Sequence, residues 1–139
     1  PQGCWTQRKP DRAETKEIEF GWDIAEKIGQ LDIGQCVVVG NGTVLAVEAI
    51  DGTDATIQRG GSLAGKNTAV VIKRSKPNQD LRFDLPSTGL KTIETMAAAG
   101  VDVLALEAGK SISFDREEMI AFANQHNICI IALTGQEIK

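Results

Sequence analysis

The stretch CVVVGNGTVLAV, residues 36–47, decides how the chain folds. Two runs of β-branched and other apolar residues, 36–39 and 44–47, flank the pair Asn41-Gly42. An Asn-Gly pair between apolar runs is the strongest short-range signal for a β-hairpin, because both residues tolerate the positive φ angles of a tight turn. The stretch therefore predicts two antiparallel strands that lie side by side.

Apolar runs further along the chain predict more strands, and helical patterns lie between them. Strands are expected at 69–72, 101–106 and 128–133, where apolar residues follow one another almost without interruption. Two helices are expected at 20–31 and at 91–99, the second with Gly100 as its C-cap. A third is expected to begin at Asp51 or Thr53 as its cap and to run toward Gly60-Gly61. A fourth is expected to begin at a capping box formed by Asp115 and Glu118. Continuous apolar strands separated by helices imply a single α/β domain, with a mixed sheet that helices cover on both faces.

Size and composition exclude several classes of protein. The chain has 139 residues and a net charge of −4, which argues against a general nucleic-acid-binding surface. No apolar run approaches the ~20 residues that a membrane helix needs. The three cysteines, Cys4, Cys36 and Cys129, form no C-x-x-C pair, which favours reduced thiols in a cytoplasmic setting.

The start of the chain is polar and charged. Residues 1–19 include Pro1 and Pro10 among many Lys, Arg, Asp and Glu residues. This composition predicts an arm or linker from a missing amino-terminal domain. Residues 20–139 are then the folded domain.

Carboxylates and cations lie at the ends of predicted strands or in the loops that follow. Ligands of α/β sheets bind beyond the carboxyl ends of strands, where Asp and Glu suit Mg²⁺ while Lys and Arg suit phosphate. This mixture predicts phosphate-ester or pyrophosphate chemistry; the alternative is that these residues are surface charges and helix caps. The acids are Glu48, Asp51, Asp54, Asp80, Asp84 and Glu107, and the cations are Lys73, Lys76, Arg82 and Lys110.

The most informative stretch is 79–85, where polar and apolar residues alternate. Asp80, Arg82 and Asp84 share one face of an extended segment, and three apolar residues share the other face. This density of polar groups favours a functional face. The alternative is an exposed strand on which one arginine pairs with the two acids.

Two other motifs are weak. Residues 60–67 nearly match the phosphate-binding loop Gly-x4-Gly-Lys-Ser/Thr, but Asn67 replaces the hydroxyl residue and the pattern before it is helical. The single histidine, His126, lacks partners for a metal site or a Ser-His-Asp triad.

Three longer stretches carry a resemblance to a known family. The stretches AVEAIDGTD (46–54), KPNQDLRFDLP (76–86) and GLKTIE (89–94) resemble the carboxy-terminal domain of the LpxI family, and the likeness runs from about Gly3 to Leu133. Members of this family are UDP-2,3-diacylglucosamine pyrophosphatases of lipid A biosynthesis. The Gln-Asp-x-Arg-x-Asp stretch with its downstream Gly-x-x-Thr-x-Glu is the specific part.

The resemblance implies Mg²⁺-dependent hydrolysis of the diphosphate in UDP-2,3-diacylglucosamine to UMP and 2,3-diacylglucosamine 1-phosphate. It also implies a second, amino-terminal domain, so this domain alone is expected to be weakly active or inactive. Peripheral contact with the inner membrane and a homo-oligomer are further expectations. The implied roles are catalysis for Asp80 and Asp84, substrate or phosphate binding for Lys73, Lys76, Gln79, Arg82 and Thr92, and metal binding for Glu48, Asp51 and Asp54.

Two other classes of function remain open from the residues. One is a non-catalytic domain that binds a sugar nucleotide or lipid on the same fold. The other is a structural or dimerisation module whose charges are solvated faces.

Overall fold

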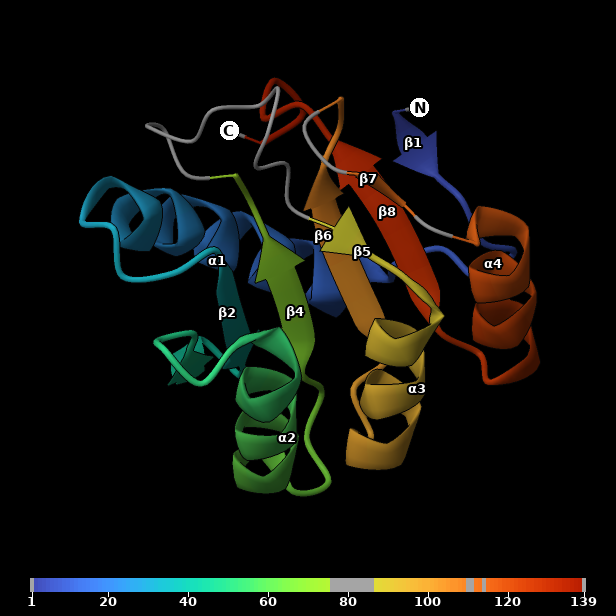
Figure 1. The fold of residues 1–139 in the computed structure, drawn as a ribbon, viewed down its shortest axis with the longest axis horizontal. Helices are drawn as coiled ribbons and strands as arrows, with labels where there is room; N and C mark the ends of the chain where they lie inside the picture. Colours follow the sequence, from blue (N-terminus) through green and yellow to red (C-terminus); the bar gives the residue numbers. More distant parts are fainter. Residues whose placement is uncertain (1, 76–86, 110–111, 114, 139) are drawn as a thin grey trace.

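A computed structural model describes residues 2–75, 87–109, 112–113 and 115–138. A six-stranded mixed sheet in the order β1-β8-β6-β4-β2-β3 forms its centre, and β5 and β7 form a second, two-stranded parallel sheet (Figure 1). The predicted α/β domain with a mixed sheet is confirmed. The elements are β1 (Gly3–Cys4), α1 (Arg12–Gln30), β2 (Cys36–Gly40), β3 (Thr43–Val47), α2 (Thr53–Ala64), β4 (Val70–Lys73), β5 (Ser87–Thr88), α3 (Leu90–Ala99), β6 (Val103–Glu107), β7 (Ile112–Ser113), α4 (Arg116–Gln125) and β8 (Cys129–Leu133).

The predicted hairpin is present as β2 and β3. The two strands pair antiparallel, and the turn residues Asn41 and Gly42 have φ angles of 53° and 70°. Tight two-residue hairpin turns require positive φ angles at their central residues, and this turn has them. The Glu17 carboxylate of α1 accepts a 2.9 Å hydrogen bond from the Gly42 backbone N–H, which ties the turn to the helix.

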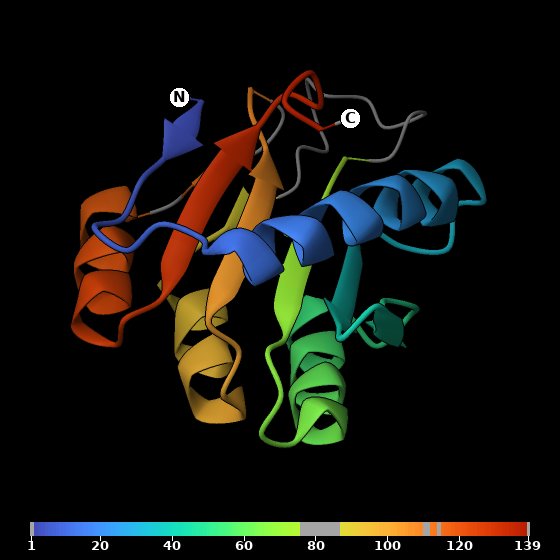
Figure 2. The ribbon, with the colours of Figure 1, turned by 180° about the vertical axis from the view of Figure 1, so that it is seen from behind.

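Helices cover both faces of the sheet. Figure 1 shows α2, α3 and α4 in front of it, and Figure 2 shows α1 crossing the opposite face. Because side chains alternate along a strand, β2 serves both layers: Val38 packs in the core beneath α2 and α3, while Val37 and Val39 pack in the core beneath α1. All three valines are fully buried. Two cores therefore hold one sheet rigidly between two helical layers.

The start of the chain differs from the prediction of an arm over residues 1–19. Gly3–Cys4 pairs with β8 in the main sheet, and α1 begins at Arg12, well before Phe20. Asp11 and Glu14 form a reciprocal capping box, in which each side chain accepts a hydrogen bond from the other residue's backbone N–H. That D-x-x-E spacing was a readable helix start, masked by the charged composition around it. A further amino-terminal domain stays a prediction.

The caps of two other helices also differ from those predicted. Asp115 is the N-cap of α4 as predicted, but it has a left-handed conformation and its side chain makes no capping bond. Gly52 is the N-cap of α2, so neither Asp51 nor Thr53 fills that position. Both helices are present, but neither begins with the predicted side-chain cap, and the Asp51 carboxylate pairs with Arg59 instead.

The near-match to a phosphate-binding loop is helical over most of its length. Gly60 and Gly61 lie inside α2. A Cβ atom at Gly60 would lie 2.5 Å from the Val38 side chain, and one at Gly61 would lie 2.5 Å from the Ala99 carbonyl oxygen. These glycines therefore let α2 pack closely against the sheet and α3. Within the described part of the chain, no helix is long and apolar enough to cross a membrane.

Candidate active site

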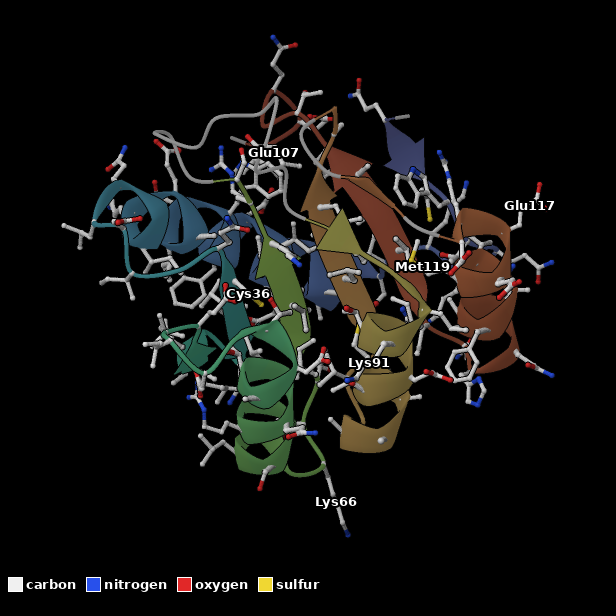
Figure 3. The ribbon with its side chains drawn as sticks, in the orientation of Figure 1. Cys36, Lys66, Lys91, Glu107, Glu117 and Met119 are labelled. Atoms are coloured by element: carbon white, nitrogen blue, oxygen red, sulfur yellow. The ribbon has the colours of Figure 1, made fainter. Side chains whose placement is uncertain are left out.

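The polar residues of interest gather where the parallel strands end. β4, β6 and β8 run in the same direction, with Lys73 of β4 opposite Leu106 and Glu107 of β6 opposite Leu133. We call this end of the sheet the carboxyl edge. β2 begins there, because Cys36 is paired with Lys73, and β3 ends there. Figure 3 shows Glu107 at this edge and Lys66 at the opposite end of the molecule.

Lys73 is the buried cation of the carboxyl edge. Only 6% of its surface is exposed, although it ends a strand. Burial lowers the pKa of its ammonium group, while the nearby thiol of Cys36 and the carboxylates of Glu48 and Asp54 oppose that shift. A desolvated cation attracts an anion more strongly than an exposed one does, so this position suits a phosphate.

Glu48 is fixed by the backbone and helix around it. Its Oε1 accepts a 2.8 Å hydrogen bond from the Gln35 backbone N–H, and its Oε2 accepts a 3.0 Å bond from the Thr53 hydroxyl. These bonds join the starts of β2 and α2 to the end of β3. Each carboxylate oxygen keeps a further lone pair, so Glu48 is held in place but still able to accept a bond.

Glu107 ends β6 and is as buried as Lys73, with 6% of its surface exposed. Its Oε1 accepts hydrogen bonds from the Ser75 backbone N–H and hydroxyl at 3.1 and 3.0 Å, and its Oε2 accepts one from Arg74 at 3.1 Å. Burial opposes the charged form, but the bonds from Arg74 and Ser75 outweigh it and lower the pKa below the ordinary 4.5. Glu107 therefore stays ionised and clamps the chain that leaves β4.

Arg74 links the two strand ends to α1. Its Nη1 donates to the Trp22 carbonyl oxygen and to Glu26, both at 3.1 Å, and its guanidinium lies 4.5 Å from the centre of the Trp22 ring. With Glu107 this makes a connected network from β6 through β4 to the helix on the opposite face. Such a network holds the carboxyl edge in one arrangement.

The start of α3 presents buried hydroxyl groups. Thr92 lies in the first turn with 9% of its surface exposed, and Thr88, just before the helix, is 1% exposed. The Thr88 hydroxyl has no hydrogen-bond partner within the described part of the chain. The N-cap Gly89 supplies no side-chain bond either. Backbone N–H groups at such a helix start favour anions, which fits the predicted role of Thr92.

The three acids predicted as metal ligands have different surroundings. Asp54 is half-buried near Lys73, whereas Asp51 is exposed and pairs with Arg59 at 3.1 Å. Among residues 2–75, 87–109, 112–113 and 115–138, no three His, Cys, Asp or Glu side chains lie close enough together to hold a metal ion. The described residues alone therefore do not form a complete metal site.

Five predicted site residues lie outside the described residues: Lys76, Gln79, Asp80, Arg82 and Asp84. Two of them are the predicted catalytic aspartates, so their roles stay predictions. Ser75, the last described residue before this stretch, is bonded to Glu107.

Two of the residues that organise the edge had no role assigned from the sequence. From the sequence, Glu107 is only one of several acids at strand ends, and Arg74 is not among the candidate residues. A signal was present, because each directly ends or follows an apolar run, but their pairing depends on the register between β4 and β6. That register is a property of the assembled sheet.

Comparisons with known proteins place this fold in a family. The family model described as "LpxI C-terminal domain" matches residues 1–131. The chain is also 38% identical over 144 residues to the UDP-2,3-diacylglucosamine pyrophosphatase LpxI of Caulobacter vibrioides, an alignment that covers 99% of this chain and 51% of that protein. The chain thus spans about half the length of this relative. It belongs to the LpxI family and corresponds to its carboxy-terminal domain.

Proposed function

We propose that this chain is the carboxy-terminal half of a pyrophosphatase that hydrolyses UDP-2,3-diacylglucosamine to UMP and 2,3-diacylglucosamine 1-phosphate. The observation that carries the proposal is the 38% identity, over nearly the whole chain, to a protein named for that activity. The carboxyl edge supports it, because buried Lys73 and the start of α3 suit the binding of a phosphate group.

The other half of the relative is the proposed partner of this domain. Because β1 runs antiparallel to β8, Gly3 lies beside Ala132 near the end of β8. Figure 1 shows the start of the chain at the same end of the molecule as the ends of β4, β6 and β8. A domain joined before residue 1 is therefore attached next to the carboxyl edge, where it can complete the site. We expect the whole enzyme to act in the cytoplasm.

The residues of the chain divide into three proposed roles. Water attacks one phosphorus atom, the bond to the bridging oxygen breaks, and negative charge builds on the oxygens. Lys73 stabilises this charge, since a preorganised cation in a dry site acts without reorganising solvent. Glu107 and Arg74 position the chain that leaves β4. Asp80 and Asp84 are the proposed acids that orient water and accept its proton.

Mg²⁺ remains a proposed cofactor of the complete enzyme. When bound, such an ion polarises phosphoryl oxygens and neutralises part of their charge. Glu48 and Asp54 are better candidates to contribute a ligand than Asp51, because the Asp51 carboxylate is engaged by Arg59. Since the described residues do not form a complete site, ligands from elsewhere in the enzyme are required.

The test is hydrolysis of UDP-2,3-diacylglucosamine by the full-length protein, measured as UMP released with Mg²⁺ and after its removal by a chelator. Asp80→Ala and Asp84→Ala test the proposed acids, and Glu117→Ala, an exposed change on the outer face of α4, is the matched control (Figure 3). We expect both aspartate variants to lose at least about 100-fold in kcat, as removal of a general base does.

Three outcomes decide between the possibilities. Failure of the full-length protein to release UMP contradicts the function. Substrate binding without turnover indicates a non-catalytic binding domain instead. Activity in both aspartate variants equal to that of Glu117→Ala contradicts only the assignment of the two acids.

A further inference from the structure

Two of the three cysteines touch each other away from the carboxyl-edge residues described above. The Sγ atoms of Cys4 and Cys129 are 4.0 Å apart, although 125 residues separate them in sequence. In the antiparallel pair of β1 and β8, Cys4 lies opposite Ile131, so Cys129 is its diagonal neighbour. The sheet itself therefore brings the two thiols together. Cys36 is fully buried in another strand, β2.

The two thiols differ in their access to solvent. Cys4 is half-buried on an edge strand, with its thiol facing the carbonyl oxygens of Arg8 and Thr6 at 3.3 and 3.5 Å. Cys129 is fully buried, and burial raises the pKa of its thiol to about 12. A small oxidant from solvent therefore reaches the Cys4 thiol more easily than the Cys129 thiol.

We propose that Cys4 and Cys129 form an oxidation site, in which Cys4 is the thiol that meets a hydroperoxide and Cys129 is the thiol that resolves the product. In the first step the Cys4 sulfur takes an oxygen from hydrogen peroxide, which gives a sulfenic acid and water. In the second step the Cys129 sulfur attacks the Cys4 sulfur, a second water leaves, and a disulfide forms. Each disulfide consumes one hydrogen peroxide and yields two waters.

The geometry indicates that this bond is slow to form and easy to reduce. A disulfide needs a sulfur separation of about 2.05 Å, so the thiols must approach by about 2 Å. Cys4 can move because β1 is only two residues long and lies at the sheet edge. The buried Cys129 also needs that movement before its thiol can ionise and attack. Disulfides formed against such a shift are strained, and strained disulfides are the labile ones in a reducing compartment.

The test exposes the reduced chain to graded hydrogen peroxide and measures its mass. Trypsin places the three cysteines in separate peptides, residues 1–8, 28–59 and 117–139, so the partners can be identified directly. We expect the intact mass to fall by about 2 Da, with peptides 1–8 and 117–139 joined and Cys36 still reduced. Dithiothreitol should restore the original mass.

Three variants separate this pairing from general oxidation. Cys36→Ser is the matched control and should form the bridge as the unmodified chain does. Cys129→Ser should leave Cys4 unresolved, so that it accumulates higher oxides with added mass. Cys4→Ser should leave Cys129 reduced at the same peroxide dose. The proposal is overturned if Cys4 gains only higher oxides in the unmodified chain, if Cys36 joins a bridge, or if Cys129 oxidises as fast without Cys4 as with it.

Discussion

Each end of the sheet holds an ion pair between a half-buried arginine and a buried glutamate, but the two glutamates bond to different parts of the chain. Near the starts of β6 and β8, Arg8 and Glu14 are 2.6 Å apart, and the Asp102 carboxylate also acts on the Arg8 charge. At the carboxyl edge Arg74 and Glu107 are 3.1 Å apart. The Glu14 and Glu107 side chains are 4% and 7% exposed, so the two carboxylates are almost equally dry.

The difference lies in what the second carboxylate oxygen does. In Glu14 it accepts a bond from the Asp11 backbone N–H and completes the cap of α1. In Glu107 it accepts two bonds from Ser75, the residue where β4 passes into the stretch that carries the proposed catalytic acids. The same chemical pair therefore caps a helix at one end, and at the other end it bonds Ser75, the last described residue before the proposed catalytic acids. Burial alone does not distinguish structure from function.

The largest effect on stability is expected when either pair is broken. Glu14→Gln removes the carboxylate that pairs with Arg8, and Glu107→Gln removes the more buried of the two carboxylates that pair with Arg74, the other being Glu26. We expect Glu14→Gln to lower the free energy of unfolding by about 3 kcal/mol and Glu107→Gln by somewhat less, measured by urea denaturation. In the full-length enzyme, below the melting temperature of both variants, kcat/KM should fall at least tenfold for Glu107→Gln only. An equal loss of activity in both variants would contradict the claim that only the Arg74–Glu107 pair supports the active site.

Close packing away from the carboxyl edge should affect stability without affecting chemistry. In Gly60→Ala the new methyl group meets the Val38 side chain, and such overpacking costs about 2 kcal/mol. We expect thermal unfolding to shift downward while kcat of the remaining folded enzyme is unchanged. A specific loss of phosphate binding in this variant would instead support a phosphate-binding loop at residues 60–67.

Low pH should lower the free energy of unfolding because it protonates Glu107. Its pKa in the folded protein lies below the ordinary 4.5, so between these two values the unfolded chain binds more protons than the folded one. The free energy of unfolding therefore decreases as the pH falls from about 5 through the folded pKa. Urea denaturation of Glu107→Gln should show a shallower decrease in the free energy of unfolding over this range. An identical pH dependence in both proteins would contradict the role of the charge.

The smallest effect is expected at the exposed pair of Asp51 and Arg59. Both side chains are more than 40% exposed, so Asp51→Asn should change the free energy of unfolding by less than about 0.5 kcal/mol. Its kcat/KM in the full-length enzyme should fall less than that of Glu48→Gln, which removes an acid held inside the edge. A larger loss for Asp51→Asn would instead favour Asp51 over Glu48 as a metal ligand.

Local patterns were enough to predict most of the fold. The Asn41-Gly42 turn, the apolar strands and Gly100 as a helix cap were all readable, because each depends on neighbouring residues. The early start of α1 was missed because charged residues hid a valid capping box. The pairing of Arg74 with Glu107 was not readable, because 33 residues separate them and only the register of β4 on β6 brings them together.

The most direct test of the carboxyl edge compares two lysines that lie at opposite ends of the molecule. Lys73→Met removes the buried cation of the edge, and Lys66→Met removes an exposed cation beyond α2. The measurement is kcat/KM for UMP release from UDP-2,3-diacylglucosamine by the two full-length variants, with folding verified by circular dichroism. We predict a loss of at least about 100-fold for Lys73→Met and less than about twofold for Lys66→Met. Equal activity of the two variants would contradict the placement of the active site at the carboxyl edge.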